Sequence, residues 1–408
     1  MRKPVAIGAL ASLLLATVLT LGVPAVALHA DWVRHTGKAL DGVAVGPDGS
    51  VYVVGTRRRS ITVEAVLIKY RPNGSRVWTR SWLPDPHAST NGIAVDVAPD
   101  GRIAWIGRVQ GQCEGSGWFL ETVRPNGELQ QRYVTPGWEC SIAQAATDVA
   151  ISNSAIVVTG IHFGCCANPL RNGWVRGFSR DAAPMWQTDF EPPAGTPRGW
   201  FDRATSVDIA ANGAIYAGGW AATEFVEDEA FAIDGTPVLN KLRADGSRIY
   251  RRRVHVQMQA LDAPVLVALA AGRVLLATSV RGGGVEWFRS NGTAGWLGSL
   301  STGGTLRWSR TWDASGDEAA GPEGLAVGPT GTIWVVGTRR DTAHHDLDLF
   351  VRRYEPNGHF VEANDRDGGV RNLLGTGVGL GDPGERYVTG TVGYRNGGKQ
   401  GRLWRFGA

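Results

Sequence analysis

The chain has 408 residues, 43% hydrophobic and 20% charged, a globular composition that excludes a disordered polymer. Its formal net charge is +4, and Arg2 and Lys3 near the N-terminus supply two of those charges. No basic stripe interleaved with aromatic residues stands out, so we do not expect nucleic acid as a partner. The 56 glycines and 16 tryptophans indicate many tight turns and thick aromatic packing.

Residues 1–27 have the order of a secretory signal peptide. Arg2 and Lys3 form a positive region, an uncharged apolar run extends from Val5 to Val23, and Pro24 and small residues follow. We expect cleavage after residue 27, or as late as residue 30, which predicts a secreted, periplasmic or cell-surface protein. The alternative is an uncleaved anchor, because the apolar run is long enough to span a bilayer. No later segment is apolar enough to span a bilayer, so no transmembrane domain is expected in the mature chain.

From residue 42 onward a passage recurs seven times. Its first copy, residues 42–55, reads GVAVGPDGSVYVVG, and the sixth, residues 324–337, reads GLAVGPTGTIWVVG. One residue closes the second apolar run of each copy, at intervals of 52 to 59: Gly55, Gly107, Gly160, Gly219, Thr278, Gly337 and Gly390. A fixed period of this size indicates a propeller or solenoid, in which each unit buries its apolar face against its neighbours.

Each copy contains four apolar runs separated by turn residues. In the first copy, residues 47–49 (Pro-Asp-Gly) and 72–74 (Pro-Asn-Gly) join successive runs. Pro presets φ and Gly accepts a positive φ, so both triplets predict hairpins. We therefore predict an all-β, seven-bladed β-propeller of four-stranded antiparallel blades over residues 31–408, as a single domain and a monomer. Six or eight blades are the alternatives, because the fifth copy has Thr278 for Gly and an insertion at 281–294.

The last copy ends before its fourth strand is due. A strand of the missing kind, Asp31–His35, stands directly after the leader. We predict that this N-terminal strand completes the last blade, which closes the ring and removes exposed sheet edges.

Residues 42–55, followed by AVLIKYRPNGSRVW at 65–78, resemble the SBBP (seven-bladed β-propeller) repeats of exported bacterial proteins. The resemblance covers essentially the whole mature chain. It implies an extracytoplasmic propeller that is often a surface or binding module and has no common enzymatic activity. Residues 324–337 are also similar to propellers of the NHL and streptogramin-lyase type.

In such a ring the tight hairpins occupy one face and the long, varied loops the other, so we expect ligands on the long-loop face. Exposed aromatics there would include Trp138, Trp200 or Trp220. Four cysteines also map to this face, and in an exported protein they predict disulfides of open connectivity: Cys113, Cys140, Cys165 and Cys166. The alternative is a vicinal disulfide between Cys165 and Cys166 against a cofactor, similar to quinoprotein alcohol dehydrogenases.

Seven residues open the innermost strands and are expected to surround the tunnel mouth: Asp41, Asn91, Thr147, Thr205, Ala263, Glu323 and Asn372. Asp41 and Glu323 could supply oxygen ligands to one Ca²⁺ or similar hard cation; the alternative is that the ring caps strand ends and binds water. No other cofactor is predicted. His344 and His345, among carboxylates, could bind a transition metal or act as acid and base, or be merely solvated.

We therefore predict a binding module whose ligand contacts Asp41, Asn91, Glu323, His344 and His345 on the long-loop face. The ligand would be a protein, a glycan or a cell-envelope component. The alternative is a propeller enzyme, a lyase or oxidoreductase, with a metal or cofactor over the central tunnel. No nucleophile elbow, zinc-binding helix motif or phosphate-binding glycine loop occurs, so no catalytic residue is assigned.

Overall fold

The computed structural model describes residues 30–407, apart from 37–38, 60–61, 112–115, 136–142, 164–171, 191–201, 227–230, 257, 260–262, 282–292, 313–319, 342–345, 367–371, 382–383 and 394–398. The leader, the four cysteines, His344 and His345 lie outside the described residues. Within the described part, no helix is long and apolar enough to cross a membrane.

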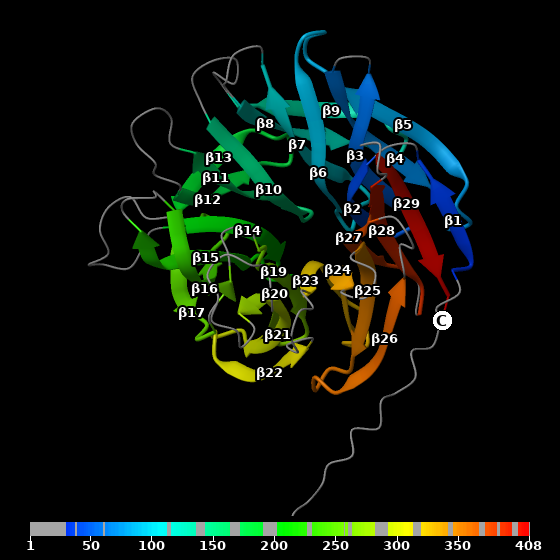
Figure 1. Ribbon diagram of the computed structural model, residues 1–408. Helices are drawn as coiled ribbons and strands as arrows, with labels where there is room; N and C mark the ends of the chain where they lie inside the picture. Colours follow the sequence, from blue (N-terminus) through cyan, green and yellow to red (C-terminus); the bar gives the residue numbers. More distant parts are fainter. Residues whose placement is uncertain are drawn as a thin grey trace, which may run out of the picture.

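The described strands form seven four-stranded antiparallel blades around a central axis (Figure 1). Blade 1 contains β2 (Ala39–Val45), β3 (Val51–Arg59), β4 (Thr62–Tyr70) and β5 (Arg76–Trp82). Blade 2 contains β6 (Ser89–Val97), β7 (Ile103–Gln110), β8 (Ser116–Val123) and β9 (Leu129–Val134). Blade 3 contains β10 (Ala143–Ile151), β11 (Ile156–Phe163), β12 (Asn172–Phe178) and β13 (Pro184–Asp189).

Blade 4 contains β14 (Asp202–Ile209), β15 (Ile215–Val226), β16 (Phe231–Leu242) and β17 (Arg248–Arg253), and the short β18 (Met258–Gln259) also pairs with β16. Blade 5 contains β19 (Leu266–Ala270), β20 (Arg273–Arg281), β21 (Thr293–Ser301) and β22 (Leu306–Trp312). Blade 6 contains β23 (Ala320–Val327), β24 (Ile333–Asp341), β25 (Asp346–Tyr354) and β26 (Phe360–Arg366). The fifth copy is thus a complete blade, and the alternatives of six or eight blades are wrong.

Blade 7 is assembled from both ends of the chain. It contains β27 (Asn372–Leu380), β28 (Arg386–Gly393) and β29 (Lys399–Phe406), and β1 (Trp32–His35) pairs with β29 as its outer strand (Figure 1). Trp32 lies opposite Arg405, and the Arg405 guanidinium is 2.9 Å from the Asp31 carboxylate. The predicted closure of the ring by the N-terminal strand is confirmed.

A tryptophan on the outer strand ties each of several blades to the next. The indole Nε1 of Trp78 donates to the carbonyl of Pro125 at 3.1 Å, and that of Trp186 to the carbonyl of Ala244 at 2.9 Å. The turn that accepts the bond carries a glycine with positive φ, such as Gly246 at 82°, and a Cβ there would lie 2.4 Å from the indole of Trp186. Glycine is therefore needed both for the turn and for the indole above it.

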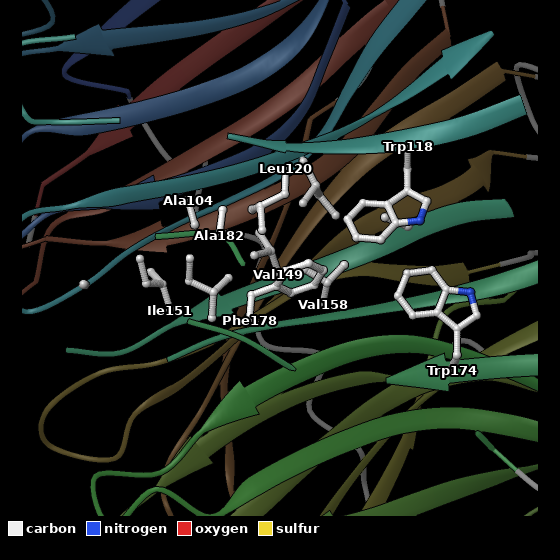
Figure 2. Packing of buried hydrophobic residues seen from close by; sticks show 13 residues of the cluster. Ala104, Trp118, Leu120, Val149, Ile151, Val158, Trp174, Phe178 and Ala182 are labelled. Atoms are coloured by element: carbon white, nitrogen blue, oxygen red, sulfur yellow. The ribbon is translucent and has the colours of Figure 1, made fainter. Parts of the chain in front are cut away.

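Apolar side chains fill the gaps between neighbouring blades. Between blades 2 and 3, Trp118 and Trp174 stack with ring centroids 5.3 Å apart, beside Leu120, Val158 and Phe178 (Figure 2). All five side chains are fully buried. The alternation of each strand thus places one face against the preceding blade and the other against the next, which fixes the blades around the tunnel.

Candidate functional site

The repeated glycine that gives the period has a structural cause at the tunnel wall. In six innermost strands the pairing with the second strand shifts by one residue, which leaves a bulged residue: Asp41, Ile93, Thr147, Thr205, Glu323 and Thr376. A Cβ on Gly55 would lie 1.9 Å from the carbonyl oxygen of Ala39 beside the bulge. Only glycine allows that approach. Blade 5 has Thr278 at this position, and its β19 shows no such shift.

All six bulged residues line one cavity of about 450 Å³. The cavity is formed by the first halves of the innermost strands, and Pro264, just before β19, completes the ring in blade 5. It therefore lies at the end of the tunnel where these strands begin, the face of the long loops. Bulges re-aim side chains, so the same irregularity that specifies glycine also directs one side chain to the lumen in each of these six blades.

Five of the seven residues expected at the tunnel mouth line this cavity: Asp41, Asn91, Thr147, Thr205 and Glu323. Ala263 and Asn372 do not; Pro264 and Thr376 take their places. Asn372 is the first residue of β27, four positions before the bulge, so counting from the strand start placed the expected residue too early.

Four polar side chains of the ring are of two kinds. Thr147 Oγ1 donates to the carbonyl of Ala204 at 2.8 Å, and Thr205 Oγ1 donates to the carbonyl of Val265 at 3.0 Å, so both bind the next blade. The carboxylates of Asp41 and Glu323 instead are open to the lumen, and neither accepts a hydrogen bond from a described residue. Two acceptor groups are therefore available at the tunnel mouth.

Both side chains remain exposed to the water of the lumen, although the tunnel wall surrounds them. Burial raises the pKa of Asp41 to about 6, against a smaller lowering by Lys399, and raises the pKa of Glu323 to about 7. A carboxyl in this range gains most from a partner that donates hydrogen bonds or carries positive charge.

Along the innermost strands, three aspartates join successive blades, and the sequence analysis did not assign them. Asp96 Oδ2 accepts the backbone N–H of Ile151 at 2.8 Å, and Asp148 Oδ2 accepts that of Val207 at 2.9 Å. Asp208 repeats the arrangement toward blade 5. Burial raises the pKa of Asp96 to about 7 and those of Asp148 and Asp208 to about 6. In the sequence, each of these aspartates interrupts the apolar residues of an innermost strand, and that interruption could have identified them.

Of the other predicted features, Trp220 alone lies among the described residues. Trp220 is 3% exposed and packs between blades rather than on the surface, so its prediction as an exposed aromatic is wrong. Trp138, Trp200, both histidines and all four cysteines lie outside the described residues. Within the described ranges, no group of three or more His, Cys, Asp or Glu is arranged to hold a metal ion.

The sequence matches no family model and no curated protein. Among solved structures, the chain is similar to the crystal structure of the polysaccharide lyase Uly1, with a TM-score of 0.55 and 12% identity over 93% of this chain and 99% of that one. An ulvan lyase with a bound saccharide gives a TM-score of 0.50 and 11% identity over 92% and 96%. The β-propeller domain of the Trilobed protease from Pyrococcus furiosus gives 0.47 and 9% over 90% and 95%. At such identities these likenesses show the propeller fold alone.

Proposed function

We propose that the protein is an exported β-propeller that binds a polyhydroxylated ligand, a glycan of the cell envelope or its surroundings, at the tunnel mouth. The observation that carries the proposal is the pair of lumen-facing carboxylates, Asp41 and Glu323, placed there by two β-bulges and left without a described hydrogen-bond donor. The SBBP-like repeats and the leader support an exported location.

The chemistry of the cavity favours hydroxyl groups over anions. Its polar lining offers carboxylate and amide oxygens, and hydrogen bonds from a sugar hydroxyl to a carboxylate are charge-assisted and strong. Its remaining walls are apolar, with Val43, Ile93 and Leu325 able to contact the C–H face of a sugar ring. A volume of about 450 Å³ lies within the usual range of small-ligand sites.

One observation favours a second candidate, a lyase. The pKa values of Asp41 and Glu323, about 6 and about 7, are near the range in which a carboxyl serves well as general acid or base at neutral pH. The solved structures that this fold resembles include two polysaccharide lyases. Binding and catalysis would use the same two side chains, so one set of variants tests both.

The experiment is a glycan array probed with the purified mature protein, followed by titration of the bound oligosaccharides. Asp41→Asn and Glu323→Gln should each weaken binding about tenfold, because each removes a charge-assisted bond. Glu128→Gln is the matched control, since Glu128 is exposed on the opposite face and paired with Arg124. Equal binding by all three variants would overturn the proposal.

Two further measurements separate the remaining alternatives. A stoichiometric Ca²⁺ in purified protein, lost in Asp41→Ala, would show that a cation occupies the carboxylate pair. Appearance of an unsaturated, ultraviolet-absorbing product from the bound oligosaccharide, absent with Glu323→Gln, would identify the lyase instead of a pure binding module.

A further inference from the structure

A second cavity, of about 700 Å³, lies at the opposite end of the ring from the tunnel mouth. It is formed where the first hairpins of blades 4, 5 and 6 meet, on the face of the tight turns. Its walls are mainly apolar, from Ile209, Leu269 and Val327 and several alanines, and two cations stand among them, Lys241 and Arg273.

Lys241 occupies the same place in blade 4 as Lys69 in blade 1. Lys69 lies opposite Tyr52 with Nζ 5.2 Å from the ring centroid, and Lys241 lies opposite Tyr216 with Nζ at 5.1 Å. The two blades differ in the counter-ion. Lys69 Nζ is 3.5 Å from the carboxylate of Asp48 in the first turn of its blade.

The residue of blade 4 that matches Asp48 is Asn212. Asp48 Oδ1 accepts the N–H of Ser50 at 3.0 Å, and Asn212 Oδ1 accepts the N–H of Ala214 at 3.1 Å. The two turns thus share one geometry, but the negative charge is absent in blade 4. Blade 4 therefore keeps the lysine, Lys241, but has Asn212 in place of the aspartate that pairs with Lys69 in blade 1.

Arg273 repeats this loss in blade 5. Its counterpart in blade 2 is Arg102, because each arginine comes directly before the buried residues of the second strand of its blade. The guanidinium of Arg102 is 2.6 Å from the carboxylate of Asp100. The turn before Arg273 is Ala271-Gly272, which has no acid. Arg273 donates one hydrogen bond to the carbonyl of Pro356 in blade 6 and forms no ion pair with a described residue.

The one carboxylate among the described residues of the lining is Asp208, and it is already engaged. Its two oxygens accept the N–H groups of Leu269 at 2.9 Å and Ile209 at 2.7 Å. Lys241 Nζ donates one hydrogen bond to the carbonyl of Thr302 at 3.2 Å, so two of its three N–H groups can still donate to a ligand. The cavity therefore holds two cations whose repeat counterparts are neutralised.

We propose that this cavity binds a small organic anion, with the anionic group between Lys241 and Arg273 and an apolar body against the alanine and leucine walls. Because Lys241 and Arg273 form no ion pair with a described residue, an anion can bind to them without first displacing a carboxylate. The apolar walls exclude a fully hydrated inorganic ion as the preferred ligand. The site is separate from the tunnel mouth and does not depend on the glycan proposal.

The test is fluorescence titration with 8-anilinonaphthalene-1-sulfonate, a sulfonate with an apolar body. The wild-type protein should show saturable, one-site enhancement, and the uncharged N-phenyl-1-naphthylamine should bind about tenfold more weakly. Lys241→Gln and Arg273→Gln should each weaken the sulfonate about tenfold. Arg243→Gln is the control, because Arg243 is an exposed cation of the same blade outside the cavity.

Asn212→Asp is the variant that keeps the proposal falsifiable if the others fold poorly. It adds the carboxylate that blade 1 carries, in a turn of the same geometry, so it should weaken the sulfonate without lowering stability. Glu323→Gln, at the tunnel mouth, should leave the titration unchanged. Binding that survives Asn212→Asp and Lys241→Gln, or that is equally strong for the neutral dye, would overturn the proposal.

Discussion

The closure of the ring makes one substitution more informative than any other. Trp32 of β1 contacts blade 1 and blade 7 together: its Nε1 donates to the carbonyl of Pro72 at 3.1 Å, and its ring centroid is 6.0 Å from that of Tyr387. A Cβ on Gly74 would lie 2.8 Å from the indole, so the turn packs directly on it.

Trp78 has the same three contacts inside a continuous stretch of chain. Its Nε1 donates to the carbonyl of Pro125 at 3.1 Å, its centroid is 6.0 Å from that of Tyr52, and Gly127 packs on its indole. Trp78→Ala is therefore a matched control for Trp32→Ala, with sequence connectivity as the difference.

The magnitude follows from the contacts. Each tryptophan is half-buried, so truncation exposes roughly 100 Å² of apolar surface, which costs about 2.5 kcal/mol, and the lost hydrogen bond adds about 1 kcal/mol. We expect both variants to lower the free energy of unfolding by about 3.5 kcal/mol, measured by urea unfolding followed by far-ultraviolet circular dichroism. An unchanged transition for Trp32→Ala beside a weakened one for Trp78→Ala would refute the closure of the ring in solution.

Three further predictions concern the tunnel and the turns. Because burial raises the folded-state pKa of Asp96 to about 7 and of Asp148 to about 6, above unfolded values of about 3.9, their protons stabilise the fold at low pH and that stability is lost as pH rises. The melting temperature should thus be higher at pH 5 than at pH 8, and Asp96→Asn should reduce that difference; an opposite slope would contradict the assignment. Gly337→Ala places a Cβ 2.0 Å from a carbonyl oxygen and should cost about 3 kcal/mol, whereas Gly303→Ala, with its nearest contact at 3.6 Å, should stay within about 0.5 kcal/mol in urea unfolding. Ala182→Gly should change stability by less than about 1 kcal/mol although Ala182 is buried, because relief of its φ of 54° offsets the lost methyl group; a loss above 2 kcal/mol would show that no strain is stored there.

The architecture could be predicted from the sequence because similar turn residues recur at matching positions in successive blades. The period marked by Gly55 and its equivalents predicts the number of blades, and Asp31–His35 predicts the closure, since a strand must fill the gap in the last blade. The irregular fifth copy still forms a blade, because its alternating apolar runs survive the change to Thr278.

The residues that line the tunnel could be predicted from the sequence only in part. Counting from strand starts found Asp41 and Glu323 but selected Asn372 instead of Thr376, because a bulge changes which residues face the lumen and has no signal in periodicity alone. To recognise Lys241 as a cation without a carboxylate partner among the described residues, the strand register was needed as well. Only the register that places it opposite Tyr216 shows that it matches Lys69, and that Asn212 stands where an acid neutralises that lysine.

Blade 7 also imposes an order on biosynthesis. In chain order β1 precedes all the strands of blades 1 to 6, and its hydrogen-bonding partner β29 follows them. During translation the backbone donors and acceptors of Trp32–His35 therefore lack their β29 partner until a strand some 370 residues downstream has been made, a span set by the pairing of Trp32 with Arg405. Until that strand arrives, six finished blades present an open rim at either end, where a second nascent copy could insert its own first strand.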